Sequence, residues 1–256
     1  MLSQRKILIL DHINEIGNVT VQELMDRFDC SKATINRDLA ALEKEGKLVR
    51  ILGGAISNRY KLTYEPKQLE KEKSQKEFKD KIGSKAIELI KNGMTIILDS
   101  GTTTLALANK INENKGISDI TVVTNDLKVG MTLGHNKSVH LIVLGGQMRT
   151  DLYSLSGLIT LKGLGNVNAD IFFLAADAVH VDKGVSNANF DEVEVKQKMM
   201  DSANLTILLA DHTKFNNYKI ARVCALEDID KIITDRRITD MEINEITEKC
   251  NDIVIA

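Results

Sequence analysis

Six consecutive residues, Asp99-Ser100-Gly101-Thr102-Thr103-Thr104, gather hydroxyl groups around one glycine. They follow an apolar run at 95–98 that is typical of a buried strand, and they open a segment with helical spacing. The first N–H groups of a helix lack partners within the helix and favour an anion. An ordinary helix cap is the alternative, but a cap needs only one hydroxyl and this segment offers four in five positions. The segment by itself is compatible with both interpretations, and our hypothesis is that it forms a phosphate-binding turn.

A second group of polar residues follows the next two apolar runs. Asn125 and Asp126 come after the run at 120–124, and Arg149 follows the glycine pair after 139–144. Open α/β sheets bind ligands in the crevice at the carboxyl ends of their strands, so Asn125 and Arg149 are candidate ligand contacts. A guanidinium suits a phosphate or carboxylate partner. We interpret Asp126 instead as the N-cap of the following helix.

A third group combines carboxylates with lysines. Asp177 and Asp211 each end an apolar strand candidate, and Lys214 follows closely after Asp211. Glu192 and Lys196 stand four residues apart on a helical segment, a spacing that by itself indicates a solvated ion pair. Carboxylates and lysines at one edge of a sheet together suit a polyhydroxylated, anionic ligand. Asp177, Glu192, Lys196 and Lys214 are therefore further ligand candidates.

These residues need a parallel sheet to position them. Short apolar runs with little polar alternation predict strands that are covered on both faces. The strand candidates are 95–98, 120–124, 139–144, 171–174, 205–209, 231–234 and 253–255. Helical segments at 102–114, 126–134, 156–165, 189–203 and 240–249 lie between most of them.

Residues 19–39 have the pattern of two short helices joined by a tight turn. Val21, Leu24, Met25 and Phe28 form one apolar face, and Ile35, Leu39 and Leu42 form the next. Ser31 is a good N-cap for the second helix. A first helix is expected at 3–16, and a short strand, a glycine turn and a partner strand at 47–56 predict a β-wing. The sequence therefore predicts a winged helix-turn-helix that binds DNA.

The second helix of this pair carries the candidate DNA contacts. Its solvent face offers side chains that can bond base edges or phosphates. Between residues 31 and 59 six basic residues face three acidic ones, although the whole chain has 34 basic and 36 acidic residues. The positive patch is therefore local. The candidate DNA contacts are Ser31, Lys32, Thr34, Asn36, Arg37 and Arg50.

Composition limits the remaining possibilities for the 256-residue chain. The three cysteines are far apart with no CxxC, and the five histidines show no metal-ligand spacing, so we expect no metal, no disulfide framework and a cytoplasmic location. The N-terminus lacks the shape of a signal peptide, and no apolar stretch approaches the length of a membrane span. We expect a DNA-binding domain at 1–57 and an effector domain at 77–256. The composition of the polar stretch at 58–76 between them predicts a solvated linker rather than a charged interaction tail.

Taken together, these motifs resemble the DeoR family of bacterial transcription regulators over essentially the whole chain. The DNA half resembles the family through Ser31, Thr34, Ile35, Arg37, Asp38 and Leu39, and through Arg50 and Gly53-Gly54-Ala55. The effector half resembles it through DSGTTT (99–104), VVTND (122–126), LGGQMR (144–149), AADAVHVDKGVS (175–186), Glu192 to Lys196 and LLADHTKF (208–215). The chain departs from the usual pattern at Asn36, where the family usually has an arginine, and at Ala175, where it usually has glycine.

The resemblance implies an effector domain shaped like sugar-phosphate isomerases that binds a phosphorylated sugar and thereby changes operator affinity. We expect a cytoplasmic repressor of sugar-metabolism genes that acts as a homodimer or homotetramer on double-stranded DNA, with no cofactor and no membrane association. An isomerase-type enzyme is the main alternative, because Asp177 or Glu192 could serve as a base. A winged helix-turn-helix has no use in such an enzyme, so we expect no catalysis. An architectural DNA-binding protein without a ligand is a second alternative, which the polar clusters disfavour.

Overall fold

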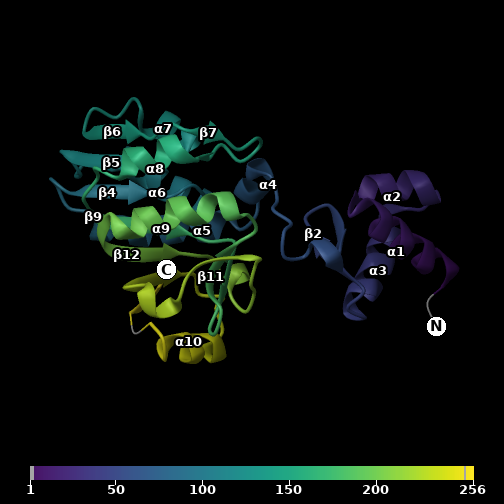
Figure 1. Ribbon diagram of the computed structural model, residues 1–256. Coiled ribbons are helices and arrows are strands. Elements are labelled where there is room, and N and C mark those ends of the chain that lie inside the picture. Colours follow the sequence, from purple (N-terminus) through teal and green to yellow (C-terminus); the bar gives the residue numbers. More distant parts are fainter. Residues whose placement is uncertain (1–2, 251) are drawn as a thin grey trace. The chain divides into compact units, whose positions relative to one another are not determined.

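The computed structural model describes residues 3–250 and 252–256. The chain divides into two compact units, one ending at Tyr64 and one running from Glu65 to Ala256. The first unit contains three helices and a three-stranded antiparallel sheet in the order β1-β3-β2 (Figure 1). Its elements are α1 (Gln4–Ile16), β1 (Asn18–Thr20), α2 (Val21–Phe28), α3 (Lys32–Lys44), β2 (Leu48–Ile51), β3 (Gly54–Ser57) and the short η1 (Asn58–Tyr60).

Capping side chains set the helix boundaries in this unit. Thr20 accepts a hydrogen bond from the backbone N–H of Glu23 and the Glu23 carboxylate accepts from the Thr20 N–H, which is a capping box. Ser31 caps α3 by accepting from the N–H of Thr34. Between α2 and α3, Asp29 takes a left-handed backbone conformation with φ 46°, which lets the chain turn sharply. The winged helix-turn-helix expected from the sequence is confirmed, with the wing formed by β2 and β3.

The second unit is built on a seven-stranded parallel sheet in the order β15-β14-β12-β9-β4-β5-β6. The strands are β4 (Thr95–Leu98), β5 (Ile120–Thr124), β6 (Val139–Val143), β9 (Ala169–Ala175), β12 (Ala203–Leu209), β14 (Lys231–Thr234) and β15 (Ile253–Ile255). All seven strand candidates are thus confirmed. The chain builds outward from β4 through β5 to β6, and then returns to the other side of β4 with β9. The boundary between β4 and β9 is therefore the switch point of the sheet.

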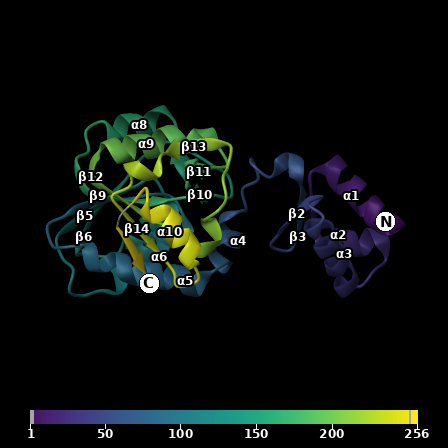
Figure 2. The same cartoon turned by 90° about the horizontal axis from the view of Figure 1, so that it is seen from below.

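Helices cover both faces of this sheet (Figure 2). Consecutive residues of β9 point to opposite sides: Phe172 packs into one apolar core and Phe173 into the other, and both are fully buried. Residues of α5, α6 and α7 complete the core around Phe173, whereas residues of α8, α9 and α10 complete the core around Phe172. These helices are α5 (Lys76–Ala86), α6 (Thr102–Glu113), α7 (Leu127–Leu133), α8 (Leu158–Leu164), α9 (Val193–Asp201) and α10 (Asp240–Thr247). Burial on both faces explains why the strands read as continuous apolar runs.

Two small antiparallel sheets lie outside the pattern expected from the sequence. One joins β10 (Ala178–His180), β11 (Gly184–Asn187) and β13 (Ala221–Cys224), and the other pairs β7 (Gln147–Met148) with β8 (Leu155–Ser156). Their strands have two to four residues, too few to show a clear alternation. Four short 3-10 helices complete this unit: η2 (Ile87–Leu89), η3 (Phe190–Glu192), η4 (His212–Lys214) and η5 (Leu226–Asp228).

The segment expected to be a solvated linker, 58–76, differs most from expectation. Its second half belongs to the C-terminal unit, which begins at Glu65 and contains the short helix α4 (Gln68–Lys73). Gln68 is only 2% exposed, and the backbone N–H of Gln68 donates to the carbonyl of Asp151. Further along, the Lys79 ammonium is buried and donates to the carbonyls of Lys71 and Ser74 at the end of α4. Interpreting 65–76 as linker was therefore wrong, because polar groups of this segment bond to the sheet domain: Gln68 to Asp151, Lys71 to Asp177 and Glu72 to Lys128.

No helix in the described part of the chain is long and apolar enough to cross a membrane.

Candidate functional site

The second helix of the helix-turn-helix, α3, presents a polar face. Ser31, Lys32 and Arg37 are exposed, while Thr34 and Asn36 are half-buried. The opposite face buries Ile35, Leu39 and Leu42 completely. Asp38 is buried as well, and its carboxylate accepts a hydrogen bond of 2.6 Å from the Arg5 guanidinium of α1. The residue types that can contact DNA therefore lie on the side of α3 that the core leaves free.

Asn36 and Arg50 form a pair that the sequence did not indicate. The Nη2 of Arg50, on wing strand β2, donates to the Asn36 amide oxygen at 2.7 Å. The Asn36 amide nitrogen donates to the carbonyl of Lys32 at 2.9 Å. Both ends of the Asn36 amide are thus engaged, and this side chain ties the wing to α3. These two hydrogen bonds fix the orientation of the Asn36 amide, and each end keeps one further hydrogen-bonding site.

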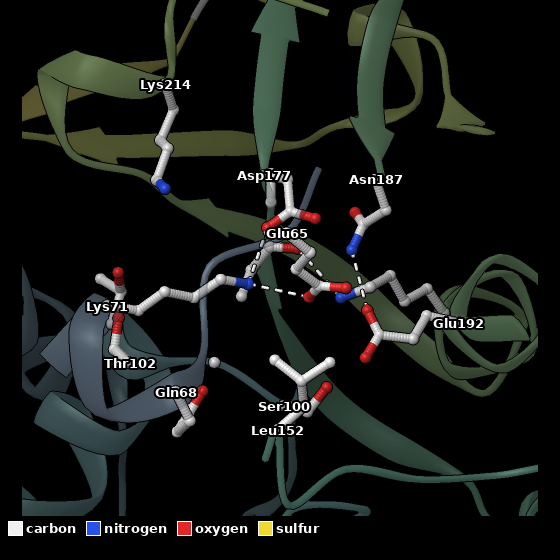
Figure 3. Close-up of a pocket in the computed structure, with 15 residues that line it drawn as sticks. Glu65, Gln68, Lys71, Ser100, Thr102, Leu152, Asp177, Asn187, Glu192 and Lys214 are labelled. Atoms are coloured by element: carbon white, nitrogen blue, oxygen red, sulfur yellow. Dashed lines mark hydrogen bonds and ion pairs between the residues drawn. The ribbon is translucent and has the colours of Figure 1, made fainter. Parts of the chain in front are cut away.

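A polar pocket opens at the carboxyl ends of β4, β9 and β12, at the switch point between β4 and β9 (Figure 3). Eight of the predicted ligand residues line it: Ser100, Gly101, Thr102, Thr103, Asp177, Glu192, Lys196 and Lys214. The other four lie outside the lining. Asp99 and Thr104 are fully buried, Asn125 donates to the carbonyl of Leu155, and Arg149 lines a neighbouring cavity.

The turn after β4 leaves hydrogen-bond donors free toward the pocket. Gly101 is the N-cap of α6, and no side chain caps this end of the helix. The Thr104 hydroxyl is used internally, donating to the carbonyls of Asp99 and Gly101. Among the residues that the structure describes, none accepts a hydrogen bond from the hydroxyls of Thr102 or Thr103. The turn therefore has the free donors and the helix dipole that an anion requires.

Lys71 of α4 reaches across the pocket (Figure 3). Its Nζ lies 2.8 Å from the carboxylate of Glu65 and 2.9 Å from that of Asp177. Burial disfavours the charge of Lys71, but Asp177 and Glu65 outweigh it and raise its pKa. Burial likewise opposes ionisation of Asp177, but Lys71 and then Lys214 hold its pKa well below the ordinary range. The two groups are therefore a charged pair at neutral pH.

The Glu192 carboxylate makes a second set of contacts in the pocket. One carboxylate oxygen accepts from the Ser154 hydroxyl at 2.9 Å and lies 2.5 Å from Nη1 of Arg149, and the other accepts from the Asn187 amide at 2.9 Å. The Nη2 of Arg149 lies 2.6 Å from Glu65. Burial raises the pKa of Glu192, but Lys196 and Arg149 reverse this and lower it overall. Arg149 lies outside the pocket lining and contacts both Glu65 and Glu192, so it holds these two carboxylates in position.

Lys196 and Asp99 form a buried ion pair at the base of the pocket. The Lys196 Nζ bonds to the Asp99 carboxylate and also donates to the carbonyl of Ala175 at 3.1 Å. The same carboxylate accepts from the backbone N–H groups of Ser100 and Ala175. Burial disfavours the charge of Lys196, but Asp99 and Glu192 raise its pKa. This pair joins α9 to the ends of β4 and β9, and so fixes the turn at 99–104.

Lys214 differs from the other cations of the pocket. It follows β12 on η4 and points into the same space as Lys71 (Figure 3). Within the described residues its ammonium has neither an ion pair nor a hydrogen bond. Two amide atoms in the lining also lack a partner among the described residues: Nε2 of Gln68 and Oδ1 of Asn187, in residues that are 2% and 4% exposed. Buried polar atoms usually find partners, so these atoms point to a polar ligand.

Seven lining residues are absent from the predicted ligand contacts, although two of them, Ala175 and Ala176, belong to the motif at 175–186: Glu65, Gln68, Lys71, Leu152, Ala175, Ala176 and Asn187. Ala175 and Ala176 stand beside the predicted Asp177, and Asn187 directly follows the segment 175–186. A prediction that included the neighbours of these motifs would have found them. Glu65, Gln68 and Lys71 gave no such signal, because their polar stretch is indistinguishable from a solvated linker by composition.

Comparisons with known proteins agree with this architecture. The family model "DeoR-like helix-turn-helix domain" matches residues 5–61, and "DeoR C terminal sensor domain" matches residues 74–236. The chain belongs to the DeoR family. These two matches coincide with the helix-turn-helix and with most of the sheet domain that carries the pocket.

Curated relatives align with this DeoR-family chain over nearly all of its length. The HTH-type transcriptional regulator GolR of Listeria innocua is 34% identical over 92% of this chain and 91% of its own. The lactose phosphotransferase system repressor of Lactococcus lactis is 33% identical over 94% of this chain and 93% of its own. Among solved structures, ribose 5-phosphate isomerase A of Methanocaldococcus jannaschii matches 56% of this chain and 55% of its own, with 18% identity and a TM-score of 0.42. That likeness carries no argument about chemistry.

Proposed function

We propose that this DNA-binding transcriptional regulator represses carbohydrate-metabolism genes and that a phosphorylated sugar releases it from its operator. The observation that carries the proposal is the pocket at the switch point. There the N-terminal end of α6 and Lys214 face carboxylates and amide atoms, and neither the Lys214 ammonium nor these amide atoms have a partner among the described residues. The relative from Lactococcus lactis is named a lactose phosphotransferase system repressor, which agrees with this role.

The phosphate of the ligand sits, in this proposal, on the N-terminal turn of α6. The backbone N–H groups and hydroxyls of Thr102 and Thr103 donate to its oxygens, and Lys214 supplies a positive charge. Asp177 and Glu192, both ionised, accept hydrogen bonds from the sugar hydroxyls. Four predicted residues outside the lining hold the lining residues in position instead of contacting the ligand: Asp99, Thr104, Asn125 and Arg149.

In this proposal α3 and the wing bind the operator DNA. Lys32 and Arg37 are exposed and contact the operator, Ser31 and Thr34 lie at the start of the same helix, and Arg50 comes from the wing. One small domain makes few contacts, and helix-turn-helix proteins usually bind paired half-sites. We therefore propose a homodimer or homotetramer acting on cytoplasmic DNA.

An isomerase activity is less consistent with the site. A general base works best when its pKa lies near the operating pH. Burial acts to raise the pKa of Asp177, but Lys71 and Lys214 pull it far below neutrality, and Glu192 is likewise lowered. Both carboxylates are already bonded within the pocket. We therefore propose a binding protein rather than an enzyme.

Operator binding in the presence of sugar phosphates tests this proposal. The DNA upstream of the protein's own gene is labelled, and anisotropy is measured with phosphorylated hexoses, pentoses and hexosamines and with the matching free sugars. An active phosphate ester is expected to shift the curve at a concentration at least about tenfold below that of the free sugar, since even one charge-assisted hydrogen bond is worth this factor.

Two variants connect that response to the pocket. Thr102→Val and Lys214→Gln should weaken the response and leave ligand-free operator binding intact. Lys162→Gln, on the exposed surface of α8, is the matched control for the loss of charge. Equal responses to an ester and its free sugar, or an unchanged response of both variants, would contradict the phosphate assignment.

A further inference from the structure

The residues from Glu65 to Ser74, here called the strap, form one wall of the ligand pocket. Glu65, Gln68 and Lys71 line the pocket (Figure 3). The other lining residues come from the turn after β4 and the start of α6, the loop before β8, the end of β9, β11, η3, α9 and η4. The strap begins directly after Tyr64, the last residue of the DNA-binding unit. The ligand pocket therefore includes the first residues that follow the DNA-binding unit in the chain.

The strap is held to the sheet domain by polar contacts at both ends. Near its start, the N–H of Gln68 donates to the carbonyl of Asp151, and Lys67 forms an ion pair with the same residue. Near its end, Glu72 forms an ion pair with Lys128. The buried ammonium of Lys79 donates to two carbonyls at the end of α4, at 2.5 and 2.7 Å. Such contacts let a segment move as a unit, since it buries little apolar surface of its own.

The strap side chains that face the pocket are suited to exchange partners with a ligand. Lys71 bridges Glu65 and Asp177 across the space that the ligand would fill. Sugar hydroxyls that donate to Asp177 would replace Lys71 there, and the ammonium would then be available to the phosphate. Gln68 brings a buried amide nitrogen with no partner among the described residues. A sugar hydroxyl would satisfy it.

We propose that the strap senses the ligand: Gln68 donates to a sugar hydroxyl, and Lys71 exchanges its ion pair with Asp177 for the anionic group of the ligand. This inference rests on the proposed function. Ligand binding then changes the contacts of the segment that continues directly into the DNA-binding unit, which gives a physical route from pocket to operator affinity. A ligand can shift a conformational equilibrium only by contacts that differ between the states, and the Lys71 exchange is such a contact.

The test uses the full-length protein, the labelled operator and the phosphate esters of the panel described above, with inorganic phosphate as the smallest probe. Lys71→Gln removes the ammonium that bridges Glu65 and Asp177, and Gln68→Met removes the unpartnered amide that would donate to the ligand. Lys73→Gln removes a lysine from the exposed side of α4 and is the matched control. Ligand affinity is measured by calorimetry, and backbone hydrogen exchange is followed across residues 65–74 with and without ligand.

We expect Gln68→Met and Lys71→Gln to weaken ligand binding at least about tenfold and to reduce the operator response. Lys73→Gln should match the wild type. Hydrogen exchange of the strap should change when ligand binds. If Lys71→Gln fails to fold, as circular dichroism would reveal, the neutral Gln68→Met and the exchange data for the wild type decide the question.

One outcome would contradict the strap inference and leave the proposed function intact. In that outcome an ester binds the wild type and releases it from the operator, both variants respond like the wild type, and hydrogen exchange of the strap does not change. If no ester of the panel binds the wild type, the proposed function itself fails. The two outcomes are therefore distinguishable in one set of measurements.

Discussion

Gly101 and Ala175 meet at the switch point of the sheet: a Cβ atom on Gly101 would lie 2.7 Å from the Cβ of Ala175. The backbone of Gly101 is extended, so the glycine is required by space and not by backbone strain. Ala175 is one of the two positions at which the sequence departs from the pattern expected for the family. The Ala175 methyl group therefore leaves no space for a side chain at Gly101.

This contact predicts a compensating pair of substitutions. Gly101→Ala should displace the phosphate-binding turn and reduce the response of operator binding to a sugar phosphate, because real Cβ atoms do not approach so closely. Gly101→Ala combined with Ala175→Gly should recover most of the response, since the obstructing methyl group is gone. Operator anisotropy with and without ligand measures both. A double variant as impaired as the single one would mean that the contact is not the cause.

The buried ion pair of Lys196 with Asp99 should contribute strongly to stability. Lys196→Met leaves the fully buried Asp99 carboxylate without its cation, which typically costs roughly 3–5 kcal/mol. Lys198→Met, two residues along the same helix and half-buried, should change the free energy of unfolding by less than about 1 kcal/mol. Denaturant unfolding followed by circular dichroism measures both. Similar losses for the two variants would contradict a special role for Lys196.

Asp126 should make stability fall as the pH rises. Burial raises its pKa to about 6, although its carboxylate caps α7 by accepting from the N–H groups of Lys128 and Val129. The unfolded value is about 3.9, so the native state holds the proton more tightly, and the stability this contributes is lost as the pH rises through about 6.

Asp126→Asn keeps a capping oxygen and removes this titration. Relative to the wild type, the variant should gain up to about 3 kcal/mol between pH 4 and pH 8, because the wild type must ionise a buried carboxylate over that range. Urea unfolding of both proteins at several pH values measures the difference. A constant difference across the range would show that Asp126 does not titrate as inferred.

Arg37 should matter more for operator binding than Asn36. Arg37 is exposed, whereas the amide of Asn36 is engaged by Arg50 and by the Lys32 carbonyl. Arg37→Ala should lower operator affinity by roughly tenfold or more and reduce the salt dependence if its partner is a phosphate. Lys115→Ala, an exposed residue of the other unit, controls for the change in net charge. Operator binding by Arg37→Ala as tight as that of the wild type would remove α3 from the interface.

The boundary at Tyr64 predicts how fragments behave. A fragment of residues 65–256 retains the strap, and we expect it to bind the sugar phosphate and to remain oligomeric in light scattering. A fragment of residues 77–256 lacks Glu65, Gln68 and Lys71, and we expect it to bind the ligand much more weakly. A monomeric longer fragment at micromolar concentration would argue against assembly through the sensor domain.

The sequence alone determined the helix-turn-helix, the wing and the strands of the parallel sheet. Each depends on neighbours along the chain: Leu39 and Leu42 share a helix face with Ile35, and a strand buried on both sides, such as 231–234, reads as an unbroken apolar run. The same locality placed Ser100 to Thr103 and Lys214 at strand ends, where parallel strands share one edge.

Only the tertiary structure decided which polar residues face the pocket and which support it. The ion pairs of Lys71 with Asp177 and of Lys196 with Asp99 join residues 106 and 97 positions apart. Helix α4 has six residues, too few to show a periodic face, and its polar side chains look like those of a solvated linker. Its place at the pocket depends on contacts with residues that are far away in the sequence, such as Asp177, so no local pattern could predict it.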